Sequence, residues 1–439
     1  MNIEVIKSYT LAILVGISLI LTFSLWSYQP YEENADDDDL VDEIDLGGVE
    51  ETKKTLVRPS TVMFNKYQYH FGFTNPADRE KLYEDMQTWV LYNVRSQEAS
   101  GPPDDQLNVE VVFPEVLPLE IISSLFTLNN VEELSTVRNF SFQRMYITLE
   151  TDNSVTFSFL STDGQTQVVA EANNSQKHEL LTYYFNTLDG LTEYTELEES
   201  DYPIYVPIGE PEMSGYTVNI EPIDPNLMKN ALFFAPDAYS VIENVTDDNE
   251  MWYQDGQRSM RIFPNRISME YVNPQENSEP LGKMDLLDRS IASINGYKGW
   301  MRDFGQSYRL ESINTPQNFI RYQMYYNSYP VFNGNNLASI EQLWIDNELS
   351  EYRRPLYTIF QPFEDNFELE KTGSELIKYL KNNSIYEIEQ IEDIQLGYRL
   401  SYSELQGSTF SLYPSWLIKV NGEWAYINFD ETNHSKGVS

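Results

Sequence analysis

One stretch near the start of the chain, residues 10–28, carries no charged side chain and constrains everything that follows it. A helix of about 19 residues is about 28 Å long, which matches the ~30 Å hydrocarbon core of a bilayer. Tyr9 lies at one end of the stretch, and Trp26 and Tyr28 lie at the other. Aromatic rings favour the membrane–water interface. The sequence therefore predicts a transmembrane helix over residues 9–29.

A cleaved signal peptide is the alternative explanation for this stretch. Signal peptides have a shorter apolar core, followed by small residues at the cleavage site. Here the apolar run continues directly into Trp26-Ser27-Tyr28-Gln29-Pro30, and no such pair of small residues follows. The pattern favours a retained membrane anchor.

The few charges near the predicted helix indicate its orientation. Lys7 and the α-amine precede the helix, whereas the first basic residue after it is Lys53. Basic residues are retained on the cytoplasmic side of a membrane. We therefore expect residues 1–8 to be cytoplasmic and the rest to be extracytoplasmic. The protein would be a single-pass protein of the cell membrane that contacts lipid through one helix.

Small residues in the predicted membrane helix are candidates for helix packing. Ala12 and Gly16 form one pair with four-residue spacing, and Ser18 and Thr22 form another. At about 100° per residue the two pairs lie on different faces. Small residues let membrane helices approach closely, although they are also common in such helices generally. The functional interpretation is a helix that touches two other helices at once.

The composition excludes several classes of function. The chain of 439 residues has 69 acidic and 29 basic side chains and a formal net charge of −40, which argues against nucleic acid as a partner. It contains no cysteine, so a disulfide, a thiol nucleophile and a thiolate metal site are impossible. Hydrophobic residues make up 41% of the chain, which is enough for a packed core.

Residues beyond the predicted helix divide into an acidic linker and three globular blocks. The linker contains the run Asp36-Asp37-Asp38-Asp39, which favours a solvated spacer. A calcium loop would instead alternate its carboxylates and include a turn glycine. The predicted fold class is α+β, a multi-domain extracytoplasmic region with antiparallel sheets. The expected boundaries are a linker at 30–55, an N-terminal domain at 56–198, a central domain at 199–299, a C-terminal domain at 300–430 and a polar tail at 431–439.

Apolar periodicity and turn residues predict the individual elements. Asp224 is a predicted N-cap, Thr372 and Glu375 form a predicted capping box, and Asn421-Gly422 is a predicted hairpin turn. The predicted helices are 77–95, 119–126, 176–188, 225–233, 281–295 and 375–380. The predicted strands are 109–113, 145–150, 154–160, 167–170, 260–263, 267–272, 308–313, 320–326, 338–345, 354–360, 416–420 and 424–428.

The sequence offers little catalytic chemistry. Its histidines are His70, His178 and His434, and neither HExxH nor GxSxG occurs. Carboxylate pairs carry no information in a chain this acidic. We therefore expect no enzyme activity, no catalytic residue, no cofactor and no metal. The most basic short stretch contains Arg353 and Arg354, which either pair with the abundant carboxylates or contact an acidic partner.

The chain resembles a known family in several short motifs. Its N-terminal segment, closed by Leu25-Trp26-Ser27-Tyr28-Gln29-Pro30, is similar to the anchor of the YycH regulatory proteins of Gram-positive bacteria. The likeness continues nearly to the end of the chain, where several motifs also resemble the companion YycI family. The remaining motifs are Val112-Phe113-Pro114, Ile204-Tyr205-Val206-Pro207, Ala231-Leu232-Phe233, Gly296-Tyr297-Lys298-Gly299-Trp300, Tyr329-Pro330-Val331-Phe332, Leu396-Gly397-Tyr398 and Pro414-Ser415-Trp416.

The resemblance implies a regulator without catalytic residues. Such a protein acts with a YycI-type partner on a membrane sensor histidine kinase of the YycG (WalK) type, which controls cell-wall metabolism. It also implies three α+β domains outside the membrane. Two other classes of function stay open from the residues alone. An extracytoplasmic receptor for wall fragments or peptides would show saturable ligand binding, and a wall hydrolase would release fragments from purified wall.

Overall fold

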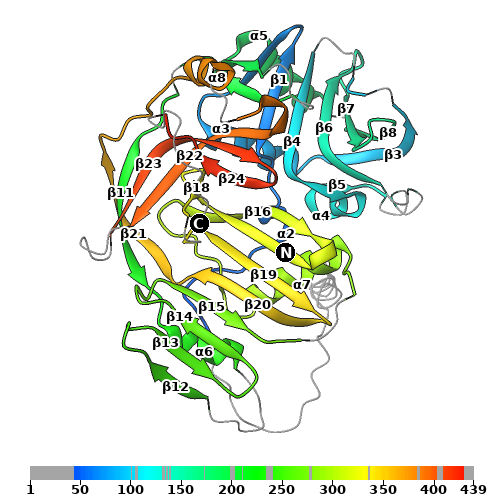
Figure 1. Cartoon of the computed structure of the whole chain (residues 1–439). Helices are drawn as coiled ribbons and strands as arrows, with labels where there is room; N and C mark the ends of the chain where they lie inside the picture. Colours follow the sequence, from blue (N-terminus) through cyan, green and yellow to red (C-terminus); the bar gives the residue numbers. More distant parts are fainter. Residues whose placement is uncertain are drawn as a thin grey trace, which may run out of the picture. The chain divides into compact units, whose positions relative to one another are not determined.

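Strands gathered into two large sheets dominate the computed structural model of the chain (Figure 1). The first sheet has 10 strands and the second has 14. Nearly all pairings are antiparallel, so the prediction of an α+β fold with antiparallel sheets is confirmed for this part. The structure describes residues 44–429 except 100, 104–106, 131–133, 135–136, 138–139, 173, 198–202, 210, 234–240, 276–278, 335–336, 383–385 and 403–408.

The first sheet has the order β10-β9-β2-β1-β4-β6-β7-β8-β3-β5, and only the β3–β5 pair is parallel. Its inner face follows the period of two that strands require. Val155, Phe157 and Phe159 of β7 are buried, as their alternation in the sequence predicts. The strands are β1 (Thr61–Lys66), β2 (Tyr69–Phe73), β3 (Val90–Glu98), β4 (Leu107–Pro118), β5 (Thr127–Leu128), β6 (Ser141–Leu149), β7 (Val155–Ser161), β8 (Thr166–Ala172), β9 (Leu191–Glu196) and β10 (Tyr205–Pro207).

The second sheet continues from the central range of the chain into its C-terminal range. Its main path is β12-β13-β14-β15-β20-β19-β17-β18-β22-β23-β11-β21, with β16 beside β17 and β24 beside β23. The strands are β11 (Gly215–Pro222), β12 (Ile242–Val245), β13 (Met251–Gln254), β14 (Ser259–Ile262), β15 (Ser268–Val272), β16 (Gln306–Asn314), β17 (Phe319–Tyr326), β18 (Tyr329–Phe332), β19 (Ser339–Ile345), β20 (Glu348–Pro355), β21 (Tyr357–Asp365), β22 (Ile391–Tyr402), β23 (Thr409–Val420) and β24 (Glu423–Tyr426).

Helices cover the sheets and begin where their caps predict. The Asp224 carboxylate accepts a hydrogen bond from the Asn226 amide at 3.0 Å, which caps α6. Thr372 and Glu375 form the predicted capping box of α8. The helices are α2 (Lys53–Leu56), α3 (Pro76–Met86), α4 (Ile122–Leu125), α5 (Ser175–Thr187), α6 (Pro225–Leu232), α7 (Lys283–Asn295) and α8 (Gly373–Asn382), with 3₁₀ turns at Leu119–Ile121, Thr315–Gln317 and Ile388–Gln390.

Two element predictions are wrong in their bounds. The helix expected over 77–95 ends at Met86, and β3 starts at Val90 because this segment pairs with β8. Tertiary pairing here overrides a helical apolar period. The strand expected over 354–360 is two strands separated by Leu356, since β20 pairs with β15 and β19 whereas β21 pairs with β11. The hairpin turn at Asn421-Gly422 is confirmed, with positive φ at both residues.

The two sheets meet through the middle of the described region. Helix α7 contacts β4 of the first sheet and β16 and β17 of the second, and β16 contacts β4 directly. One hydrophobic core therefore runs through both sheets. A smaller core lies under α8 and includes Leu376, Val206 and Trp416. Strands from the predicted central and C-terminal domains share the second sheet. The boundaries of the three predicted domains stay predictions.

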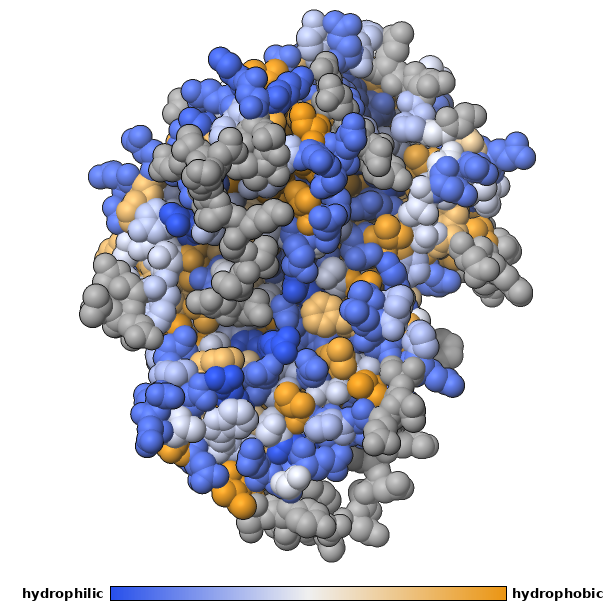
Figure 2. All heavy atoms as spheres, in the orientation of Figure 1, coloured by the Kyte–Doolittle hydropathy of each residue, from blue (hydrophilic) through white to orange (hydrophobic). Residues whose placement is uncertain are grey.

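Several expectations concern residues outside the described part. The transmembrane helix over 9–29, the anchors Tyr9, Trp26 and Tyr28, the pairs Ala12/Gly16 and Ser18/Thr22, and the tail at 431–439 all lie there. None of the helices that the structure describes combines the length and apolar character needed to cross a membrane. Figure 2 shows one face of the molecule, on which hydrophilic residues predominate and hydrophobic residues are scattered.

The end of the predicted acidic linker is docked rather than solvated. The amides of Leu46, Gly48 and Val49 donate hydrogen bonds to the carbonyls of Tyr297, Lys298 and Trp300, at 3.0, 3.1 and 2.9 Å. The Leu46 side chain is buried, and Glu51 is paired with Arg302. The expectation of a free spacer through residue 55 is therefore wrong from Ile44 onward. The acidic composition hid the contribution of the apolar Leu46, whose burial stabilises the ordered conformation of this segment.

Gly48 allows this segment to approach the chain at 298–300. A Cβ atom at Gly48 would lie 2.4 Å from the Trp300 carbonyl oxygen and 2.6 Å from that of Lys298. We therefore expect Gly48→Ala to release the segment and to lower the free energy of unfolding by about 1–3 kcal/mol. Amide hydrogen exchange should show faster exchange at Leu46 and Val49. Gly47→Ala is a poor control because Gly47 has a positive φ, so Gly209→Ala, which meets nothing within 4 Å, serves instead. Unchanged exchange in Gly48→Ala would contradict the prediction.

Candidate functional site

The two arginines predicted as a partner contact have different surroundings. Arg354 is buried, and its guanidinium donates to the Gly299 carbonyl at 2.7 Å and to the Tyr352 hydroxyl at 3.1 Å. Arg353 is partly exposed and pairs with Glu270 at 2.7 Å. It also lies 3.4 Å from Glu351. Arg354 thus has no free surface for a partner, and the geometry of Arg353 matches the alternative of internal pairing. A partner contact at Arg353 stays a prediction.

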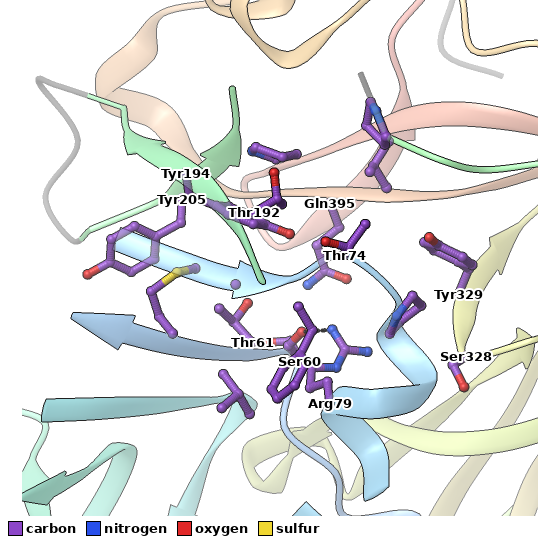
Figure 3. A pocket seen from close by; sticks show the side chains of 18 of the residues that line it. Ser60, Thr61, Thr74, Arg79, Thr192, Tyr194, Tyr205, Ser328, Tyr329 and Gln395 are labelled. Carbon is purple, nitrogen blue, oxygen red and sulfur yellow. Dashed lines mark hydrogen bonds between the residues drawn. The ribbon is translucent and has the colours of Figure 1, made fainter. Parts of the chain in front are cut away.

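A cavity between the two sheets is the main candidate site of the described region. We call it the arginine cavity; its volume is about 110 Å³. Residues in and beside the strands of the first sheet supply Ser60, Thr74 and Tyr194, and α3 supplies Arg79. The second sheet and its turns supply Ser328, Tyr329, Gln395 and Trp416. Figure 3 shows Arg79 beside Ser60, with the other labelled side chains around the same space.

Arg79 is placed by the first turns of α3. Asn75 caps this helix by accepting a hydrogen bond from the Ala77 amide at 3.0 Å, and Pro76 is its first residue. The Arg79 Nη1 donates to the Ser60 carbonyl oxygen at 2.5 Å. The residue as a whole is partly exposed, but its Nε has essentially no accessible surface and no hydrogen-bond partner. The residue lines the cavity, and its Nε is a buried donor without a partner.

The charge around Arg79 is unbalanced. Its neighbour Glu80 is hydrogen-bonded to Arg309, whose guanidinium lies 4.0 Å from the centre of the Tyr325 ring. Burial and the nearby Arg309 lower the pKa of Arg79, and Glu80 offsets this only in part. Two guanidinium groups thus share one carboxylate, within a protein whose net charge is −40.

A second cavity, of about 270 Å³, adjoins the first and shares Ser60, Thr61 and Tyr205 with it. We call it the acidic cavity, because Glu311 and Asp393 line it together with Arg144 and Lys419. The Asp393 carboxylate accepts from the Gln395 amide group at 2.6 Å and from the Ile394 backbone at 2.8 Å. Burial raises the pKa of Asp393 despite these bonds.

Glu311 enters the acidic cavity because β16 has a bulge at this residue. Leu310 pairs with Tyr322 and Ser312 pairs with Arg321, so Glu311 is the extra residue of the strand. The side chain is buried, and its Oε2 has no hydrogen-bond partner. Burial raises the pKa of Glu311 to about 7, although Arg321 and Lys419 act in the opposite direction.

A buried polar cluster around Glu110 closes one side of the acidic cavity. The Glu110 carboxylate accepts hydrogen bonds from Arg144, from the Tyr146 hydroxyl at 3.0 Å and from the Tyr205 hydroxyl at 2.7 Å. Arg144 also donates to the Pro203 carbonyl at 3.1 Å. Burial, reinforced by the Glu110 charge, raises the pKa of both tyrosines. The cluster joins β4, β6 and β10.

The two histidines that the structure describes, His70 and His178, show no arrangement typical of catalysis. His70 Nδ1 lies 2.8 Å from the Asn65 side-chain oxygen, and its ring packs on Tyr205. His178 lies on α5, and His434 is outside the described residues. In the part of the chain that the structure describes, no group of three or more His, Asp or Glu side chains could hold a metal ion. The expectation of no metal and no cofactor stays a prediction.

Sequence reasoning missed Arg79, Glu110 and Glu311. The only signals were an arginine on a short helix and single acidic residues inside apolar strands. Neither is specific in a chain with 69 acidic and 29 basic residues. Their partners lie far away along the chain: Glu110 and Tyr205 are 95 residues apart.

Two family models match the chain in succession. The model for the YycH protein, N-terminal domain, matches residues 4–189, and the model for the YycH protein, C-terminal domain, matches residues 201–434. Together they extend over nearly the whole sequence, including the predicted membrane helix.

Individual relatives agree with the family match. The chain is 21% identical over 455 residues to a Bacillus subtilis (strain 168) protein named two-component system WalR/WalK regulatory protein YycH, with 98% of this chain and 97% of that protein covered. The crystal structure of YycH from Bacillus subtilis superposes with a TM-score of 0.67 at 18% identity, covering 88% of this chain and 100% of that chain. The structural match shows that the fold is shared.

Proposed function

Because this chain belongs to the YycH family, we propose that it regulates a two-component system by acting on a membrane sensor histidine kinase. The observation that carries the proposal is that the N-terminal and C-terminal family models together match nearly the entire chain. In addition, the chain is similar along almost its whole length to a relative named as a WalR/WalK regulatory protein. The protein has no enzymatic role in this proposal. Its partners are the kinase, of the WalK type, and a YycI-type regulator.

The mechanism we propose uses the membrane helix and the extracytoplasmic region together. In this mechanism the signal passes through helix packing or through contacts outside the membrane. The Ala12/Gly16 face packs on one partner and the Ser18/Thr22 face packs on the other. The docked segment from Ile44 to Glu51 supports this proposal, because it leaves only residues 30–43 between the predicted helix and the docked part of the chain.

Substitutions in the helix test the proposal. We expect Gly16→Ile to change kinase output by up to about tenfold, because membrane packing contacts contribute about 1–2 kcal/mol and 1.4 kcal/mol corresponds to a factor of ten. Thr22→Ile should weaken crosslinks to a different partner. Kinase output is measured with a reporter of the response regulator, and partners are identified by crosslinking in native membranes.

The matched control is Ile17→Phe, which adds bulk on a side of the helix away from both faces. It should leave output and crosslinks unchanged, and all three variants should insert into the membrane equally. If Gly16→Ile and Thr22→Ile behave like Ile17→Phe, the helix is a tether and signalling through its packing is wrong. If deletion of the whole gene leaves kinase output unchanged, regulation itself is wrong.

A further inference from the structure

We infer that the arginine cavity is a binding site for a small ligand with a carboxylate group, which Arg79 holds. The site lies where the two sheets meet, so an occupant would touch strands from both of them. The inference goes beyond kinase regulation and depends on the geometry and the charges of the cavity.

The first argument is the state of the Arg79 guanidinium. Arginine has five N–H donors, and buried donors in folded proteins are nearly always satisfied. Only the Nη1 bond to the Ser60 carbonyl is present among the described residues, and the buried Nε has no partner. Nη2 makes no hydrogen bond to a described residue and, unlike Nε, keeps accessible surface, so it can donate a charge-assisted hydrogen bond to a carboxylate in the cavity.

The second argument is electrostatic. An unpaired buried charge is costly, and proteins normally place a carboxylate beside it. This chain has 69 carboxylate side chains, yet the adjacent Glu80 is bonded to Arg309 instead. An incoming anion would supply the charge that Arg79 lacks.

The third argument is the size and lining of the cavity. A volume of about 110 Å³ is below the ~150 Å³ of a cavity that holds benzene, so only a small group fits inside. Tyr194, Tyr329 and Trp416 supply ring surface, while Ser60, Thr74 and Gln395 supply polar groups. This lining suits a carboxylate on a body of two or three carbons, or the same group at the end of a larger molecule.

Isothermal titration of the full chain in detergent micelles tests the inference, with acetate and propionate as probes in low-salt buffer. We expect saturable binding in roughly the millimolar range, with propionate the tighter of the two because it buries one more CH₂. Arg79→Gln should weaken binding by at least about tenfold. Arg95→Gln is the matched control, because Arg95 is exposed and pairs with Glu171, and it should bind like the parent.

A separate measurement distinguishes a ligand anchor from a structural arginine. Arg79→Gln removes a buried charge that Glu80 offsets only in part, so its melting temperature should be unchanged or higher, whereas loss of a fully paired structural arginine would lower it. Should Arg79→Gln fail to fold, Arg79→Lys decides, since it keeps the charge but lacks the guanidinium Nη2 donor and should still weaken binding at least about threefold.

The contrary outcomes are equally defined. No saturable heat with either carboxylate, or equal binding by the parent and both Arg79 variants, would overturn the inference. Binding of inorganic phosphate without binding of carboxylates would overturn the assigned ligand class. None of these measurements involves a kinase. Failure of the carboxylate-binding inference is therefore distinguishable from failure of the proposed regulatory function.

Discussion

Replacing Glu110 with Leu is expected to lower the free energy of unfolding by about 3–5 kcal/mol, because it leaves a largely buried guanidinium without its carboxylate. Glu110 is 2% exposed and is the shared acceptor of Arg144, Tyr146 and Tyr205. Its removal therefore strands three donors at once. Equilibrium urea unfolding of a chain shortened to residues 44–439, followed by tryptophan fluorescence, measures the loss.

Two further variants make the Glu110 result specific. The double substitution Glu110→Leu with Arg144→Met removes both charges and should recover most of the lost stability, since buried pairs are often replaceable by apolar side chains. Glu120→Leu is the control on an exposed residue nearby, and it should change stability by less than about 0.5 kcal/mol. A loss below about 1 kcal/mol in Glu110→Leu would contradict the prediction, because it would show that Arg144 does not need the Glu110 carboxylate in the folded protein.

The second large effect concerns pH and Glu311. Burial raises the pKa of this carboxyl from 4.5 to about 7 in the folded protein. Between these two values the native state holds a proton that the unfolded state has released. Stability from this group is therefore greatest at low pH, falls as the pH rises from about 4.5 to about 7, and is constant above that. One pKa unit corresponds to about 1.4 kcal/mol, so the change amounts to about 3 kcal/mol.

The substitution Glu311→Gln separates the effect of Glu311 on the pH dependence of stability from the effects of the other carboxylates. At pH 5 both folded proteins carry a neutral side chain, but the unfolded parent is already largely ionised, so the variant should be the more stable by only about 1 kcal/mol. At pH 8 the variant should be the more stable by up to about 3 kcal/mol, since the parent must bury a charge. Arg321, Lys419, Glu341 and Glu423 also act on Glu311, so their charges are left in place.

Glu120→Gln is the control for Glu311→Gln, and its difference from the parent should not vary between pH 5 and pH 8. Urea unfolding at four pH values is sufficient. A stability difference between Glu311→Gln and the parent that is independent of pH would contradict the raised pKa. A difference that grows toward low pH would show that the sign is wrong.

Local chemistry was readable from the sequence because it depends on neighbours along the chain. The Asp224 cap, the Thr372/Glu375 capping box and the Asn421-Gly422 turn were each predicted from residues at most three positions apart. The alternation in β7 gave the buried face of that strand directly. The fold class and the family followed from these patterns and from short motifs in a particular order.

The sites depended on contacts that no local pattern encodes. Arg79 reaches its cavity only because α3 lies between two sheets whose strands are distant in the sequence. Glu311 is buried by a bulge in β16, which a periodic pattern cannot show. Glu110 finds Tyr205 across 95 residues.

The sequence by itself determined the charge-free stretch that predicts a membrane helix, the acidic character, the lack of cysteine chemistry and most individual elements. These follow from composition and from interactions within a few residues. The tertiary structure alone decided which charges are buried, where the two sheets enclose cavities, and that the segment from Ile44 is docked. The physical reason is that the free energy of a charge depends on its surroundings in space, and folding brings those surroundings from distant parts of the chain.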